Sequence, residues 1–198
     1  MDKPANTQYP VSAAVKARWS PRALKPESVP ADQMRSLLEA ARWTASAFNE
    51  QPWRFIVALR DETVEFERML GCLVPGNQQW ARNAGALILT VVSESFSRND
   101  KANGSAQYDV GQAASALALQ ATELGLRVHQ MAGIDRAKIR ETYGVPAGFV
   151  PLTGIAVGYP GPLGELPEGL REMESAPRER KPQSELVFSG KWGDPAVW

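Results

Sequence analysis

The sequence predicts an α+β or α/β fold in a single domain. Helical and strand patterns alternate along the chain, and neither type is confined to one half of it. The chain has 198 residues, of which 43% are hydrophobic and 22% are charged, so it can form one sizeable core. We therefore expect one domain across residues 1–198, with residues 160–198 as an extended tail.

Helices are indicated by apolar periodicity and by residues typical of helix ends. The clearest amphipathic pattern lies in residues 30–43, where Met34, Leu37, Leu38 and Ala41 recur at spacings of three and four. The other expected helices are at residues 12–17, 61–70 with Gly71 as the C-cap, 108–124 ended by Gly125, and 135–143, capped by Asp135 and stopped by Gly144.

Strands are indicated by short apolar runs between these helices. They are expected at residues 55–59, 86–92, 128–131 and 152–158. Residues 93–107 are polar and contain Asn103-Gly104, which predicts a loop.

Two segments point beyond a single folded chain. Residues 108–124 carry alanine and leucine nearly all round the helix, which predicts a helix buried inside the protein. The tail from Pro160 is rich in proline and glycine and has too few apolar residues for a core of its own. We expect the tail to lie across another surface, such as a partner subunit.

Composition argues against several classes of protein. Lysines and arginines number 22, as do aspartates and glutamates, so a nucleic-acid partner is not expected. The one cysteine and one histidine, Cys72 and His129, are too few for a disulfide or a Cys/His zinc site. The longest apolar run is too short to span a bilayer, and the N-terminal segment lacks an apolar leader pattern. The expected location is the cytoplasm, with no membrane partner.

Familiar catalytic motifs are missing from the sequence. It contains no GxxxxGK[ST] phosphate loop, no GxGxxG after a strand and no GxSxG elbow. A Ser-His-Asp arrangement around His129 stays open, although a polar residue on a strand edge is the simpler interpretation. Cys72 follows a helix-ending glycine and is more typical of a buried thiol than of a nucleophile.

Four segments carry residues suited to binding. Residues 18–22, Arg-Trp-Ser-Pro-Arg, place two arginines beside a serine, a combination that suits an anion. Residues 45–53 read Ala-Ser-Ala-Phe-Asn-Glu-Gln-Pro-Trp, small residues followed by amides. Residues 108–111, Tyr-Asp-Val-Gly, open the apolar helix that ends in Leu124-Gly125-Leu126. Residues 178–182, Arg-Glu-Arg-Lys-Pro, form a basic run near the C-terminus. Each has a simpler interpretation by itself, as a solvated turn, a packing loop, a core helix or a charged surface.

Together, in this order and spacing, the four segments resemble the nitroreductase family of flavoproteins. The family carries one or two serines and then N-x-Q-P-W after its second helix, and a D-x-G-x-A…G-L central helix. The resemblance runs from about Val11 to Trp192. It implies an α+β fold with a central mixed or antiparallel sheet flanked by helices. It also implies a homodimer that exchanges C-terminal tails and binds two FMN molecules at the subunit interface.

The resemblance also implies roles for particular residues toward FMN. Arg18, Arg178 and Arg180, with Trp19 and Ser20 nearby, would hold the phosphate. Arg22 and Asn77 would face the pyrimidine edge, where a cation favours the reduced form. Backbone N–H groups of Gln130, Met131, Ala132 and Gly133 would lie near N5. The partner subunit would contribute Ala45, Ser46, Ala47 and Asn49 against the ring. Many relatives have a lysine at the position of Trp80.

The function implied is an FMN-dependent NAD(P)H oxidoreductase. A nicotinamide would reduce the flavin, and the flavin would then reduce a small-molecule electron acceptor, such as a nitroaromatic or a quinone, in a ping-pong reaction. No side-chain acid or base and no metal is required, so no catalytic residue is assigned. The alternatives are a relative that dehalogenates or fragments flavin, a flavin-binding protein without enzymatic activity, and an interaction domain without cofactor.

Overall fold

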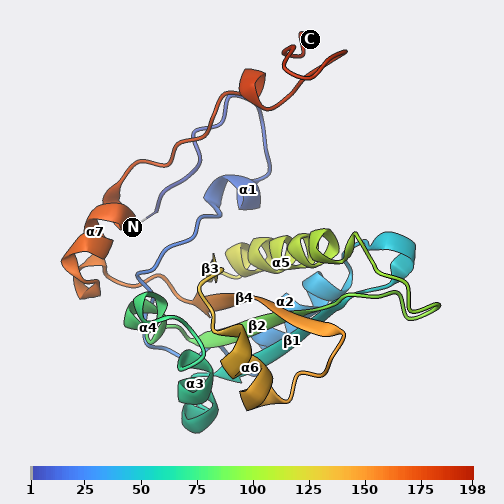
Figure 1. Ribbon diagram of the computed structural model, residues 1–198. Coiled ribbons are helices and arrows are strands. Elements are labelled where there is room, and N and C mark those ends of the chain that lie inside the picture. The colour runs from blue at the N-terminus through green and yellow to red at the C-terminus, as the bar shows by residue number, and fades with distance from the viewer. Residues whose placement is uncertain (1) are drawn as a thin grey trace.

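The computed structural model describes residues 2–198 and shows a four-stranded antiparallel sheet with helices on both faces (Figure 1). The strands pair in the order β1-β2-β4-β3. They are β1 (Trp53–Leu59), β2 (Ala86–Ser93), β3 (Arg127–Met131) and β4 (Phe149–Gly158). Because every neighbouring pair is antiparallel, the α+β prediction is confirmed and the α/β alternative is not.

The helices connect these strands and extend the chain at both ends. In chain order they are α1 (Ala13–Ala17), α2 (Ala31–Arg42), the 3₁₀ turn η1 (Ala47–Asn49), α3 (Thr63–Leu70), α4 (Pro75–Ala81), α5 (Ala106–Glu123), α6 (Arg136–Tyr143), η2 (Leu163–Glu165), α7 (Glu168–Ser175) and η3 (Gln183–Glu185). The expected end signals act as predicted at α6. The Asp135 side chain accepts a hydrogen bond from the Lys138 N–H at 2.9 Å, and Gly144 ends the helix with φ at 61°.

Two hydrophobic clusters cover the two faces of the sheet. On one face α2 and α5 pack against alternate residues of β2, including Ile88 and Val92. On the other face α3, α4 and α6 pack against Leu87 and Leu89. With both faces covered, seven of the eight residues of β2 are buried, which explains why its sequence is a continuous apolar run rather than an alternating one.

Two helices were missed by the sequence analysis. Helix α4 has only seven residues, begins with Pro75 and contains Gly76, so it shows little apolar periodicity. Helix α7 lies in the Pro- and Gly-rich tail, where no helix was expected. Its position depends on tertiary contacts, because Leu170 packs against the core cluster below it.

Helix α5 is buried on one face only in the single chain. Val110, Ala113 and Leu117 are fully enclosed, whereas Tyr108 is 72% exposed and Gly111 and Ser115 lie on the open face. The prediction of a helix buried nearly all round therefore holds for half of its circumference. The open face includes the small residues Gly111 and Ser115 among larger polar side chains.

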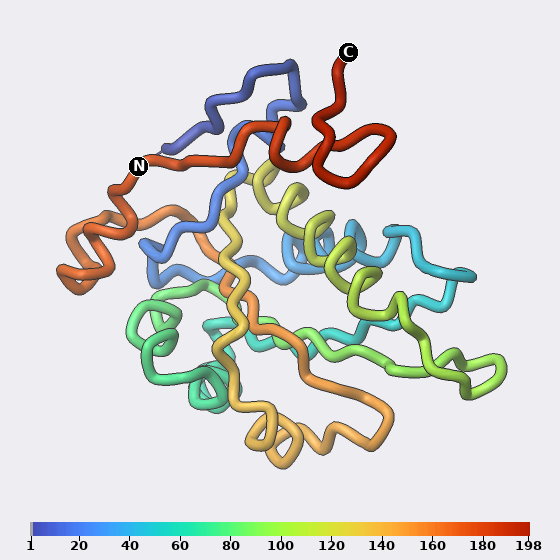
Figure 2. Tube along the Cα trace, turned by 45° about the horizontal axis from the view of Figure 1, so that its top comes forward, coloured from blue at the N-terminus to red at the C-terminus, as the bar shows by residue number. Residues whose placement is uncertain are grey.

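The tail divides into two parts. Residues 160–176 pack on their own chain, with Pro160 bridged to Leu24 and Leu166 only 4% exposed. Residues 177–198 run beside the N-terminal arm, residues 2–11, and then extend away from the sheet (Figures 1 and 2). Their last segment exposes Trp192 and Trp198 almost completely. Among residues 2–198, no helix has both the length and the hydropathy needed to cross a membrane.

Candidate functional site

A hollow of about 360 Å³ lies where the N-terminal segment meets the C-terminal tail. It brings together all the candidate residues from the two basic segments, which are more than 150 positions apart in sequence. They are Arg18, Trp19, Ser20, Arg22, Arg178 and Arg180. A larger cleft of about 720 Å³ adjoins this hollow and shares Arg18, Arg178 and Arg180 with it.

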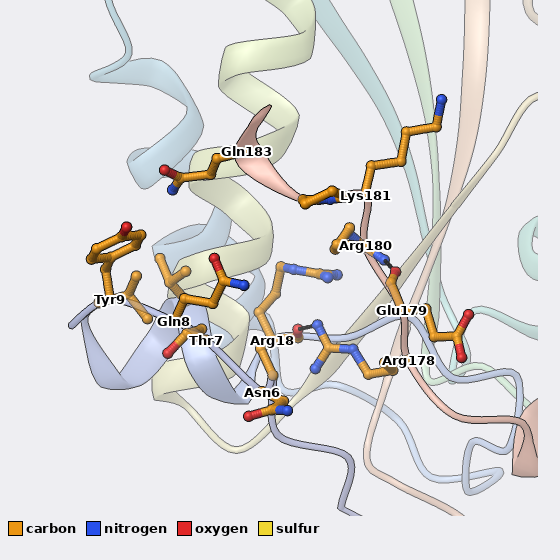
Figure 3. A pocket seen from close by; sticks show the side chains of 14 residues that line it. Asn6, Thr7, Gln8, Tyr9, Arg18, Arg178, Glu179, Arg180, Lys181 and Gln183 are labelled. Atoms are coloured by element: carbon orange, nitrogen blue, oxygen red, sulfur yellow. Dashed lines mark hydrogen bonds between the residues drawn. The ribbon is translucent and has the colours of Figure 1, made fainter. Parts of the chain in front are cut away.

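The larger cleft lies between the N-terminal arm and the tail (Figure 3). Asn6, Thr7, Gln8 and Tyr9 line one side, and Arg180, Lys181 and Gln183 line the other. Arg18 lies between the two sides, with Arg178 beneath it. The guanidinium cluster, Arg18, Arg178 and Arg180, therefore forms the boundary between the two cavities.

The guanidinium cluster is held by backbone oxygens rather than by acids. Arg178 donates to the carbonyl of Arg18 at 2.9 Å and to the carbonyl of Lys3, and Arg18 donates to the Ser20 hydroxyl at 3.2 Å. No carboxylate among residues 2–198 forms an ion pair with any of the three guanidiniums. Burial, and then the charges of Arg178 and Arg180, lower the pKa of Arg18. This uncompensated positive charge is suited to a bound anion.

Trp19 also lines the smaller hollow and is 8% exposed. Its indole Nε1 is buried and finds no acceptor within the described part of the chain, which is unusual for a buried donor. Because this N–H is enclosed rather than open to the hollow, the donors available to a ligand there come from the three unpaired guanidiniums. This donor set fits a phosphate group better than it fits a metal or an apolar ligand.

Arg22 is fixed by an acid that the sequence analysis did not identify. The Glu174 side chain of α7 is 2% exposed and accepts hydrogen bonds from the backbone N–H groups of Arg22, at 2.8 Å, and Ala23, at 3.1 Å. The Arg22 guanidinium lies 3.9 Å from the same carboxylate. The sequence could not single out Glu174, because it is one of several glutamates in a polar tail.

His129 connects the same N-terminal segment to β3. Its Nδ1 lies 3.2 Å from the carbonyl oxygen of Pro21, and its ring centroid lies 4.5 Å from that of Trp80. Burial, followed by the positive charge of Arg22, lowers the pKa of His129 to about 4. Trp80 itself is 1% exposed, so the residue that stands where many relatives have a lysine belongs to the core.

The segment after β3 approaches Asn77 of α4. The Asn77 side chain donates to the Gly133 carbonyl at 3.0 Å, and the Val74 N–H donates to the same oxygen at 3.1 Å. A Cβ atom at Gly133 would lie 2.5 Å from Asn77 Nδ2 and 2.7 Å from Val74 Cγ2, so a larger residue would displace these side chains. Met131 is 6% exposed and points into the core, whereas Gln130 and Ala132 are exposed.

The segment expected to face the ring, residues 45–49, lies apart from these groups. The Ala47 N–H donates to the buried Asp109 carboxylate at 3.1 Å, which fixes this segment at the start of α5. Phe48 and Asn49 have φ angles of 54° and 56°, a left-handed conformation that costs free energy in non-glycine residues. The Ser46 hydroxyl accepts from the Gln51 N–H at 3.0 Å and holds the turn together.

The structure therefore brings together the candidates from the two ends of the chain and links them to β3. It does not bring residues 45–49 to them within one chain. Those residues lie at the beginning of α5, and the guanidinium cluster lies toward the other end of that helix (Figures 1 and 2). A helix of 18 residues is about 27 Å long.

Comparison with known proteins identifies the family. The nitroreductase family pattern matches residues 15–159. An uncharacterized 15.4 kDa protein of Mycolicibacterium smegmatis is 35% identical over 72% of this chain and 99% of its own length. The crystal structure of an oxidoreductase containing FMN is 34% identical, covers 96% of both chains and superposes with a TM-score of 0.90. An FMN-dependent nitroreductase of Clostridium difficile R20291 is 26% identical over 74% of this chain and 85% of its own, with a TM-score of 0.61.

The fold is thus that of an oxidoreductase scaffold, and the chain belongs to the nitroreductase family. The match of residues 15–159 includes the sheet, α5 and the first basic segment. It ends before the tail that carries Glu174, Arg178 and Arg180.

The buried His129 predicts a specific acid sensitivity. The pKa of His129 is about 4 in the folded protein, against an unperturbed value of 6.5. As the pH falls below 6.5, the unfolded chain therefore binds a proton at this histidine and the folded chain does not. Wild-type unfolding free energy should fall by about 2 kcal/mol more than that of His129→Gln between pH 7 and pH 5. Urea denaturation at both pH values measures this. Identical pH dependence in the two proteins would contradict the prediction, because the chain has no other histidine.

Proposed function

We propose that this protein is an FMN-dependent oxidoreductase that uses NAD(P)H to reduce a small-molecule acceptor, such as a nitroaromatic or a quinone. The observation that carries the proposal is the hollow lined by the unpaired guanidiniums of Arg18, Arg178 and Arg180. When bound, FMN accepts a hydride from the nicotinamide and then transfers electrons to the acceptor. The residues of the chain supply binding, orientation and electrostatics.

The guanidinium cluster would hold the FMN phosphate. Burial, and then repulsion from neighbouring guanidiniums, lowers the pKa of both Arg18 and Arg178, and a dianion there would offset that repulsion. Hydrogen bonds to a charged group are each worth about 1.5–3 kcal/mol, so three guanidiniums supply a large part of the binding free energy. The Ser20 hydroxyl, already in contact with Arg18, completes the donor set.

The pyrimidine edge would face Arg22 and Asn77. Arg22 lies in the same basic segment as Arg18. Asn77 is linked to this region through its hydrogen bond to the carbonyl of Gly133, which follows β3. A fixed cation near this edge stabilises the negative charge that develops there on reduction. The neutral His129 would hold the segment at Pro21 in place without taking part in proton transfer.

The active unit would be a homodimer with composite sites. Residues 45–49 are fixed at the beginning of α5, whereas the segments that carry the guanidinium cluster lie toward the other end of that helix, so we expect one flavin to contact both groups only across two subunits. The small residues on the open face of α5 would let a second α5 approach closely, and a two-fold axis would bring residues 45–49 of one subunit to the arginines of the other. The exposed aromatic residues of the segment 177–198 would then pack on the partner.

The comparisons support the cofactor and the reaction class. A related structure that is 34% identical contains FMN and is described as an oxidoreductase. A second related structure is described as an FMN-dependent nitroreductase. Neither fixes the physiological acceptor of this chain, for which a permissive, open cleft is the relevant feature.

The first test of this proposal is cofactor identity and turnover. Purified or reconstituted protein should be yellow, release FMN on heating and oxidise NAD(P)H in the presence of a quinone or a nitroaromatic. Double-reciprocal plots at several acceptor concentrations should be parallel, as a ping-pong reaction requires. Release of FAD, or failure to bind flavin after reconstitution, would contradict the proposal. Tight FMN binding without turnover would favour a non-enzymatic flavin-binding protein.

The second test concerns the phosphate. Arg180→Ala should weaken FMN binding by about tenfold to a hundredfold and leave riboflavin binding nearly unchanged, because riboflavin lacks the phosphate. Lys181→Ala is the matched control, since it removes an adjacent charge that is exposed and not part of the smaller hollow. Isothermal titration with both ligands measures the difference. If Arg180→Ala weakens the binding of FMN and of riboflavin equally, Arg180 does not act on the phosphate.

The third test concerns the composite site. One chain carries Arg18→Ala with Arg180→Ala, and the other carries Ala45→Trp, which blocks the ring side from an exposed position. Each homodimer should be inactive. In a heterodimer all lesions collect in one site and the other site is intact, so mixed and refolded chains should regain up to about half of the wild-type activity per dimer. Proven heterodimers without activity would mean that each site lies within one chain.

A further inference from the structure

Glu174 is a buried carboxylate outside the part of the chain that matches the family pattern. It lies in α7, whereas the match ends at residue 159. Its side chain is 2% exposed and lines the smaller hollow together with Arg18, Ser20 and Arg22. A buried charge is costly unless donors surround it, so this position calls for a reason beyond helix packing.

The donors around Glu174 all belong to Arg22 and its neighbour. Oε1 accepts from the Arg22 N–H at 2.8 Å and from the Ala23 N–H at 3.1 Å, and Oε2 lies 3.1 Å from the Arg22 N–H. The Arg22 guanidinium reaches Oε2 only at 3.9 Å, a long contact for an ion pair. The carboxylate thus fixes the backbone of Arg22 firmly and its charged group only loosely.

The end of α7 is itself anchored. Lys3 Nζ donates to the backbone carbonyls of Glu174 and Ala176, which closes the last turn of the helix onto the N-terminal arm. The exposed face of α7 carries other acids, among them Glu172, that make none of these contacts. Glu174 is therefore held in a defined position relative to Arg22.

We propose that Glu174 is a positioning residue that orients Arg22 toward the pyrimidine edge of FMN and partly offsets its charge. This inference rests on the proposed function. Two effects follow from one side chain. Its hydrogen bonds to backbone N–H groups hold the segment from Ser20 to Ala23 in place. Its negative charge weakens the field of Arg22 and so lowers the reduction potential of the bound flavin, because less positive charge remains to stabilise the reduced form.

The two effects separate by mutation. Glu174→Gln keeps an oxygen acceptor of the same size but removes the charge. It should strengthen the binding of reduced FMN relative to oxidised FMN by about threefold to tenfold, and a tenfold change equals about 30 mV for a two-electron couple. Glu174→Ala removes the acceptor as well. It should weaken both redox forms, and riboflavin in equal measure, because the segment that carries Arg22 loses its anchor.

The experiment measures the midpoint potential of bound FMN by anaerobic dye-linked reduction, and the affinity for oxidised FMN by titration. Glu172→Gln is the matched control, since it removes an exposed charge from the same helix and should leave the potential unchanged. If Glu174→Gln does not fold, Glu174→Asp withdraws the carboxylate by one methylene and should also raise the potential. In the Arg22→Gln background, the part of the Glu174→Gln shift that comes from the position of Arg22 should disappear, whereas the direct effect of the carboxylate charge should remain.

The outcomes distinguish this proposal from the function on which it rests. Wild-type protein that binds no FMN would contradict the proposed function itself. Wild-type protein that binds FMN, with a Glu174→Gln or Glu174→Asp potential equal to or below that of the wild type, would overturn the role of Glu174 and leave the function intact. A raised potential in Glu174→Gln, absent in Glu172→Gln, would support it.

Discussion

Mutual repulsion among Arg18, Arg178 and Arg180 is the constraint on which the arrangement of both chain ends depends. Three guanidiniums share one boundary between two cavities, and no described carboxylate neutralises them. Such a cluster persists because backbone carbonyls accept from it and because the N-terminal arm and the tail hold each other, through the contacts of Lys3 with α7 and of Arg178 with Arg18. A bound anion would convert this repulsion into attraction and would tie the two termini together more firmly.

Helix α5 separates this cluster from the strained turn at residues 45–49. The turn is fixed by Asp109 in the first part of the helix, whereas the segment near Arg18 lies toward its other end. A rigid helix of about 27 Å cannot bend to close that distance. The left-handed conformations of Phe48 and Asn49 cost free energy that the single chain does not recover through a visible contact with the other candidates. The proposed second subunit would account for both features.

The sequence predicted the sheet and the main helices, because these depend on local patterns, and it selected the basic residues that the structure brings together at the smaller hollow. The apolar run of β2 and the end signals Asp135 and Gly144 act within a few residues of chain. What it could not predict depends on contacts over long sequence separations. Glu174 accepts a hydrogen bond from the backbone N–H of Arg22, which lies 152 positions away in the sequence. The position of α7 depends on its packing against the core cluster rather than on apolar periodicity in its own sequence. The open face of α5 was likewise not predicted, because its small residues are also typical of a buried core.

The chemistry of the site is set by fixed charges rather than by a titrating acid or base. His129 lies in contact with the segment that carries Arg22, yet burial and that arginine keep its ring neutral at physiological pH. Cys72 is fully buried, and burial raises the pKa of its thiol, so it offers no nucleophile. The remaining variable near the proposed pyrimidine edge is the balance between Arg22 and Glu174. A weak pair at 3.9 Å leaves part of the arginine's field available, and a tighter pair would remove it. In the proposed site, the distance between these two side chains would therefore adjust the charge at the pyrimidine edge without changing the residues that hold the phosphate.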